Sequence, residues 1–149
     1  MPKMKISLLS LLSALLLMLS PVSQAEQKQT FANQEVHYIA LNSTFLTPKI
    51  ARAYKIKRSG YNALINISVL DTNQVGNPSI AANLTGTAKN LLGNVTPLEF
   101  REIKEGDAVY YLAELAFRNE ETYSFDIKVV SQDKSNRLKF IQKFYVEDN

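Results

Sequence analysis

The sequence predicts an all-β fold, an antiparallel β-sandwich of about seven strands with an immunoglobulin-like arrangement. Apolar and polar side chains alternate over most of the chain beyond residue 33, and this period of two is that of half-buried strands. Turn-forming residues such as Gly, Asn, Asp and Pro separate the alternating segments at short intervals. Many short strands at such spacing are typical of sandwiches, with a barrel as the alternative.

The first 25 residues are predicted to be a signal peptide helix that precedes this domain. Two lysines come before an apolar run at residues 6–20, and the small residues Ser23 and Ala25 follow it. That order is the pattern of a secretory leader, and cleavage is expected after Ala25. The apolar run is 15 residues long (20 − 6 + 1), shorter than the roughly 20 residues that a membrane-spanning helix needs. We therefore expect an exported protein without a stable membrane anchor after cleavage, and the lack of cysteine favours the bacterial periplasm as its compartment.

The remainder of the chain has the size and composition of one small domain. Removal of residues 1–25 leaves 124 residues (149 − 25), of which 26–33 are expected to form a loose N-terminal segment and 34–149 a single sandwich domain. The net charge of +3 falls to about +1 (3 − 2) without the two leader lysines, which argues against a nucleic-acid partner. The chain contains no cysteine, so packing alone must hold the domain together.

Seven segments carry the strand pattern. In the clearest of them Tyr123 begins an apolar face that continues at every second residue to Val129. Gly86 lies inside a long strand and suggests a bulge or bend there. In the last strand Gln142 falls on the apolar face, and we expect it to lie near a sheet edge or to have a hydrogen-bond partner. In chain order, the seven segments are residues 36–41, 63–69, 80–91, 98–103, 109–117, 123–129 and 138–146.

One segment between the first two predicted strands has a helical pattern instead. Thr47 can cap the start of a helix, and Pro48 suits its first position. The apolar residues Ile50, Ala53 and Tyr54 then share one face at helical spacing. The spacing predicts a short helix over residues 47–54.

The most suggestive functional feature is a run of basic residues with no acidic residue among them. In a nearly neutral domain such a run forms a local positive patch, which suits an anionic partner in the cell envelope. Phosphorylated lipid headgroups, acidic glycans and acidic protein surfaces all have that chemistry. The alternative interpretation is a solvated helix face and loop. The candidate residues are Lys49, Arg52, Lys55, Lys57 and Arg58, with Tyr54 and Tyr61 close by.

The inventory of reactive residues argues against an enzyme. His37 is the only histidine, and it lies in a predicted strand with no nucleophile motif nearby, so neither a Ser-His-Asp triad nor a zinc site is expected. We therefore predict no catalytic residue, no metal and no cofactor. A hydrolase that uses carboxylates such as Glu99, Glu102 and Asp107 is one alternative, although Glu99 and Glu102 should lie on opposite faces of a strand. A small-ligand carrier with a cavity between the sheets is another.

Segments along the whole chain beyond the leader carry a family resemblance. Among them are VHYIALNSTFL at residues 36–46, IARAY at 50–54, FREI at 100–103, EGDA at 105–108, and LKF and QKFYV at 138–146. Together they resemble an uncharacterised family of small periplasmic proteins of Gram-negative bacteria, a domain of unknown function. The resemblance implies export and a compact β-rich domain, and it transfers no catalytic or binding residue. The predicted function is a non-enzymatic binding or accessory domain for an envelope protein or an anionic envelope component.

Overall fold

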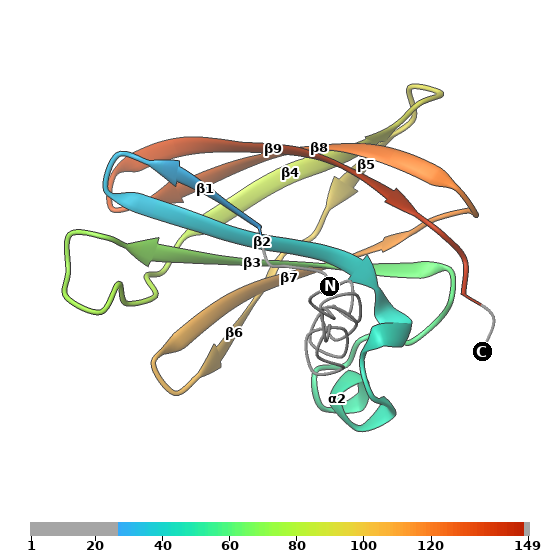
Figure 1. The fold of residues 1–149 in the computed structure, drawn as a ribbon, viewed down its shortest axis with the longest axis horizontal. Helices are drawn as coiled ribbons and strands as arrows, with labels where there is room; N and C mark the ends of the chain where they lie inside the picture. The colour runs from blue at the N-terminus through green and yellow to red at the C-terminus, as the bar shows by residue number, and fades with distance from the viewer. Residues whose placement is uncertain (1–26, 148–149) are drawn as a thin grey trace, which may run out of the picture.

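Nine strands form two antiparallel sheets in the computed structural model, which describes residues 27–147 (Figure 1). The five-stranded sheet has the order β1-β2-β3-β7-β6, and the four-stranded sheet has the order β5-β4-β8-β9. Both sheets are open, so the predicted sandwich is confirmed and the barrel is not formed. The predicted leader and its cleavage site lie outside the described residues. The strands are β1 (Gln27–Phe31), β2 (Gln34–Asn42), β3 (Asn62–Asp71), β4 (Asn83–Asn90), β5 (Val95–Leu98), β6 (Arg101–Glu105), β7 (Ala108–Ala116), β8 (Glu121–Ser131) and β9 (Lys134–Phe144).

The structure has nine strands where about seven were predicted, because two sequence-based expectations were wrong. Residues 27–31, expected to belong to a loose segment, form β1 and pair with β2 in the register Gln27 opposite Tyr38. Residues 98–103, expected to be one strand, contain the end of β5 and the start of β6, which belong to different sheets. Apolar and polar residues alternate from Leu98 to Arg101, and only the consecutive polar pair Arg101 and Glu102 interrupts this period at the crossing.

The core lies between the two sheets, where stacked aromatic rings pack among aliphatic side chains. Phe140 stacks on Tyr38 and on Phe125, with a ring-centroid distance of 4.5 Å in both pairs. Phe117 stacks on Phe144 at 5.1 Å. Tyr38 and Phe117 come from the five-stranded side and the other three rings from the four-stranded sheet. These rings therefore occupy the space in which a carried ligand would have to sit.

Two single-residue expectations had different outcomes. Gly86 does not form a bulge, because the register from Asn83 opposite Val130 to Asn90 opposite Tyr123 is unbroken. A Cβ at Gly86 would instead lie only 2.7 Å from Cγ1 of Ile127, so the glycine permits close approach of β8. Gln142 lies in β9, an edge strand of the four-stranded sheet, as expected.

The predicted helix is confirmed, but a different face of it is buried. A 3-10 turn, η1 (Ser43–Phe45), follows β2, and α2 (Pro48–Ala53) follows η1. The Thr47 hydroxyl accepts a hydrogen bond from the backbone NH of Ile50 at 3.3 Å, which caps the helix. Ala51 is buried, whereas Ile50 and Ala53 are exposed. Ala51 packs against the outer surface of β3 and β7, and Tyr54, directly after the helix, packs partly against the same cluster.

Candidate functional site

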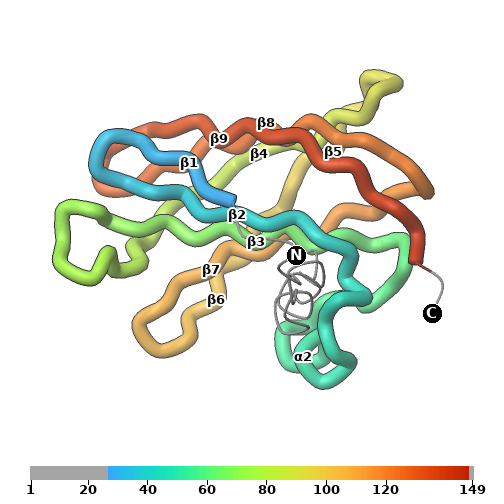
Figure 2. The backbone as a smooth tube through the Cα atoms, in the orientation of Figure 1, coloured from blue at the N-terminus to red at the C-terminus, as the bar shows by residue number. Residues whose placement is uncertain are grey.

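The predicted basic residues lie in the connection between β2 and β3, at one end of the sandwich (Figure 2). Asn42, the last residue of β2, is buried and anchors this connection. Its Nδ2 donates hydrogen bonds to the carbonyl oxygens of Gly60, at 3.0 Å, and Tyr145, at 3.2 Å. Its Oδ1 accepts from the NH of Thr44 at 3.1 Å. The end of β2, the start of β3 and the chain after β9 are thereby held together.

A second set of polar contacts fixes the returning half of the connection. The fully buried Ser43 hydroxyl lies 2.9 Å from the carbonyl oxygen of Lys57 and accepts from the NH of Ser59 at 3.0 Å. The Glu114 carboxylate of β7 accepts from the NH of Lys57 at 2.8 Å and from Nδ2 of Asn62 at 2.8 Å. Because the backbone at Lys57 is bonded from two sides, the basic side chains project from a well-held frame.

All five predicted basic residues are exposed, but they do not have equal roles. The Arg58 guanidinium donates from Nε to the carbonyl oxygen of Leu46 at 2.9 Å and from Nη2 to that of Thr44 at 3.2 Å. Arg58 therefore stabilises the connection itself. The other four form no ion pair with a carboxylate within residues 27–147. We call these four residues the basic patch: Lys49, Arg52, Lys55 and Lys57.

Three aromatic residues at the same end of the sandwich are more than half exposed: Phe45, Tyr61 and Tyr145. Arg58 bonds the residues on either side of Phe45, and Asn42 bonds both Tyr145 and the residue before Tyr61. Exposed aromatic side chains beside basic ones are enriched at protein interfaces. Tyr61 was expected beside the basic residues, but Phe45 and Tyr145 were not, because only the long-range contacts of Arg58 and Asn42 bring their backbones to one place.

The predicted catalytic alternatives are scattered or engaged in structural contacts. Glu102 accepts a hydrogen bond from the Tyr111 hydroxyl at 2.9 Å, and this bond is the main cause that lowers the pKa of Glu102. Glu99 and Asp107 are exposed, in the β5–β6 connection and the β6–β7 turn. Nε2 of His37 lies 3.0 Å from the carboxylate of Glu35. Within residues 27–147, no three His, Asp or Glu side chains are grouped so that they could hold a metal ion.

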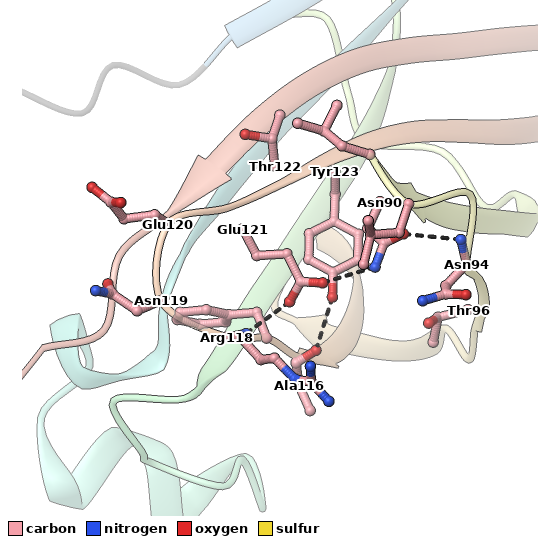
Figure 3. A pocket seen from close by; sticks show the side chains of 13 residues that line it. Asn90, Asn94, Thr96, Ala116, Arg118, Asn119, Glu120, Glu121, Thr122 and Tyr123 are labelled. Atoms are coloured by element: carbon pink, nitrogen blue, oxygen red, sulfur yellow. Dashed lines mark hydrogen bonds between the residues drawn. The ribbon is translucent and has the colours of Figure 1, made fainter.

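A cavity of about 550 Å³ lies between the β4–β5 hairpin and the β7–β8 turn (Figure 3). The Glu121 carboxylate in it accepts from Nδ2 of Asn90 at 2.9 Å and from the NH of Arg118 at 2.8 Å. Burial opposes ionisation of Glu121, but these hydrogen bonds outweigh it and leave its pKa lowered. Burial raises the pKa of Tyr123 to about 12, and its hydroxyl donates to the carbonyl oxygen of Ala116 at 3.4 Å. The hydrogen bonds of Glu121 therefore join the β4–β5 hairpin to the β7–β8 turn.

The two open antiparallel sheets and a single short helix define a small β-sandwich domain. The model of a family described as "Domain of unknown function (DUF4426)" matches residues 28–147, and the chain belongs to this family. The predicted resemblance is thereby confirmed.

One similar solved structure belongs to this family, and two structures of much lower identity share the fold. The crystal structure of a DUF4426 family protein from Pseudomonas aeruginosa PAO1 is 35% identical, with a TM-score of 0.73 over 85% of this chain and 99% of that one. FetP of uropathogenic Escherichia coli strain F11, expressed in the periplasm of E. coli, is 12% identical, with a TM-score of 0.58 over 83% of this chain and 96% of that one. A copper-bound FetP variant is 13% identical, with a TM-score of 0.57 over 80% and 95% of the two chains. The similarity to FetP shows the fold alone.

A search of the curated proteins found no match. Within residues 27–147, no helix is long and apolar enough to cross a membrane.

Proposed function

We propose that this protein is a non-enzymatic periplasmic binding domain that holds an acidic envelope protein on its basic patch. The observation that carries the proposal is a set of four exposed cations with no carboxylate partner among residues 27–147, beside three exposed aromatic residues on a hydrogen-bonded frame. An acidic protein surface would replace the missing counter-charges, and the aromatic rings would supply apolar contact area. The secretory pattern of residues 1–25 supports the periplasm as the compartment.

The copper binding of the FetP variant is not proposed for this protein. Copper sites in proteins draw on thiolate, thioether and imidazole ligands. Beyond residue 25 this chain has no cysteine, no methionine and one histidine, His37. His37 lies beside the Glu35 carboxylate, to which Lys28 also donates a hydrogen bond at 3.0 Å. The donor set of the chain therefore differs from that of a copper carrier, although the folds are similar.

The test is site-specific photocrosslinking in living cells. A photoreactive residue at position 55 should capture an acidic envelope protein, and one at Val75, in the fully exposed loop after β3, should not. Two charge reversals, Lys49→Glu with Lys55→Glu, should abolish the crosslinked product. Arg58 is left unchanged because its guanidinium stabilises the connection.

A matched control reverses two lysines on the other side of the sandwich, Lys89→Glu with Lys128→Glu. This variant has the same net charge as the first, and it should keep the crosslinked partner. A folded Lys49→Glu, Lys55→Glu variant that still captures the same protein would refute the role of the basic patch.

A further inference from the structure

The outer face of the four-stranded sheet carries a second group of cations, distinct from the basic patch. Residues of β8 alternate between the core, where Phe125 and Ile127 are buried, and the outer face, where Lys128 is exposed. Because β8 pairs with β4 and β9, the outward residues of those two strands lie beside the outward residues of β8. We call this surface the cationic sheet face, and its exposed basic residues are Lys89, Lys128, Arg137, Lys139 and Lys143.

One carboxylate, Asp126, lies on the outward side of β4, β5, β8 and β9 among these five cations. It accepts hydrogen bonds from Nε and Nη2 of Arg137, at 2.5 and 2.8 Å, and lies 3.7 Å from Nζ of Lys139. Five cations and one carboxylate leave a net charge of +4 (5 − 1) on this face. Lys89 and Lys128 make no ion pair within residues 27–147. Such a face repels a second copy of itself and attracts an anionic surface.

Apolar side chains accompany these charges at one end of the face. Val95 and Ile141, both more than half exposed, lie at the two ends of one cross-strand row that contains Lys89. Leu91 and Leu92 in the β4–β5 hairpin are 83% and 84% exposed. In Figure 1 this hairpin rises beyond the four-stranded sheet, on the side away from the five-stranded sheet. Leu91 and Leu92 follow Lys89 by two and three residues in this hairpin, and they also line the cavity between the hairpin and the β7–β8 turn.

We propose that the cationic sheet face binds reversibly to the surface of an anionic phospholipid bilayer. The lysines would meet the phosphate headgroups, each adding attraction near an anionic surface, while the leucines of the hairpin reach the acyl-chain boundary. A bilayer matches both features, because a soluble acidic polysaccharide has no apolar phase for the leucines. The inference goes beyond the proposed function, since α2 and the basic patch lie on the five-stranded side of the sandwich (Figure 1).

The test is a flotation assay, in which the protein purified after expression of the whole gene is mixed with vesicles. Mass spectrometry determines the residue at which the purified chain begins. Vesicles of phosphatidylethanolamine with phosphatidylglycerol should bind the protein, and vesicles of phosphatidylcholine alone should not. Added salt should weaken binding because it screens the headgroup charge. Lys89→Glu with Lys128→Glu should reduce binding at least about 25-fold, from about fivefold for each lysine. Leu91→Ser with Leu92→Ser should reduce it about tenfold, through loss of apolar burial.

The control is the Lys49→Glu, Lys55→Glu variant, which has the same net charge but an intact sheet face. It should bind the anionic vesicles as the wild type does, while losing its crosslinked protein partner. Equal loss of vesicle binding in both charge variants would show an effect of net charge alone and would overturn the proposal. Binding of the wild type to a soluble acidic polysaccharide but not to anionic vesicles would also overturn it. Circular dichroism establishes that every variant is folded.

Discussion

The side chain of Asn42 makes four hydrogen bonds that join three parts of the chain, at residues 44, 60 and 145. It is 5% exposed, so water does not replace a partner that is lost. In the sequence Asn42 is one asparagine at the end of a predicted strand, and nothing near it indicates that residues 60 and 145 supply its acceptors. A buried amide of this kind is visible only after distant segments have been placed around it.

We predict that Asn42→Ala lowers the free energy of unfolding by about 2–4 kcal/mol. The substitution removes these hydrogen bonds and leaves the buried carbonyl group of Gly60 and the carbonyl group of Tyr145 without their donor. Urea denaturation at neutral pH measures the change. Asn73→Ala, at an exposed asparagine in the loop after β3, is the matched control and should change stability by less than about 0.5 kcal/mol. Equal stability of the two variants would contradict the structural role of Asn42.

At the scale of elements, Asp71 links the loop that follows β3 to the β8–β9 turn. Its carboxylate accepts from Nε2 of Gln74 at 2.8 Å, from the NH of Asn73 at 2.9 Å and from Nε2 of Gln132 at 3.2 Å. The hydrogen bond from Gln74 is the largest cause that lowers the pKa of Asp71 below its ordinary value of 3.8. Ionised Asp71 therefore stabilises the link between one sheet's loop and the other sheet's hairpin.

The sign of the resulting pH dependence follows from that lowered pKa. The stabilisation is fully present above about pH 3.8, the ordinary value, and is lost as the pH falls through the lower pKa of the folded state. We predict that Asp71→Asn unfolds at less urea than the wild type at neutral pH, and that this difference narrows below pH 3.8. Urea midpoints across the acid range measure it. Glu99→Gln, at an exposed site, should leave the midpoints unchanged, and a constant gap for Asp71→Asn would refute the linkage.

At the scale of the whole molecule, most basic residues lie on two surfaces, although the net charge of the chain is small. Ten of the 17 basic residues lie on the two surfaces described above, counting Arg58 with the basic patch. Four acidic residues follow one another along β6 and its flanking turns without forming a common site, and Arg101 and Lys104 of the same strand partly balance them; they are Glu99, Glu102, Glu105 and Asp107. Two separate cationic surfaces would let one domain lie on a membrane and hold a protein partner at the same time.

We predict that export removes residues 1–25. The protein purified from a Gram-negative host that expresses the whole chain should begin at Glu26, which intact mass spectrometry measures. Ala25→Phe places a bulky residue where the cleavage pattern requires a small one and should cause the precursor to accumulate. Glu26→Gln, just beyond the expected site, is the control and should be processed as the wild type is. A wild-type protein that keeps Met1 after export would show that this segment is not a cleaved leader.

The local pattern of residues along the sequence was sufficient to predict much of the fold. Alternation of apolar and polar residues depends on neighbours in the chain, so it correctly predicted β2, β3, β7, β8 and β9, and the Thr47–Pro48 pair correctly predicted α2. β1 was missed because its residues are mostly exposed and show little alternation. Ala51, rather than Ile50, became the buried residue of α2 because the contact with β3 and β7 sets the orientation of so short a helix.

The sequence by itself determined the all-β class, the absence of disulfides and the family, because these follow from composition, periodicity and local segments. Only the tertiary structure decided which strands share a sheet and which cations share a surface. A period of two tells which side chains of one strand point the same way, but strand pairing between distant residues decides which faces are joined. Lys89, Lys128 and Lys139 belong to three separate strands, and the hydrogen-bonded register of β4, β8 and β9 makes them one surface.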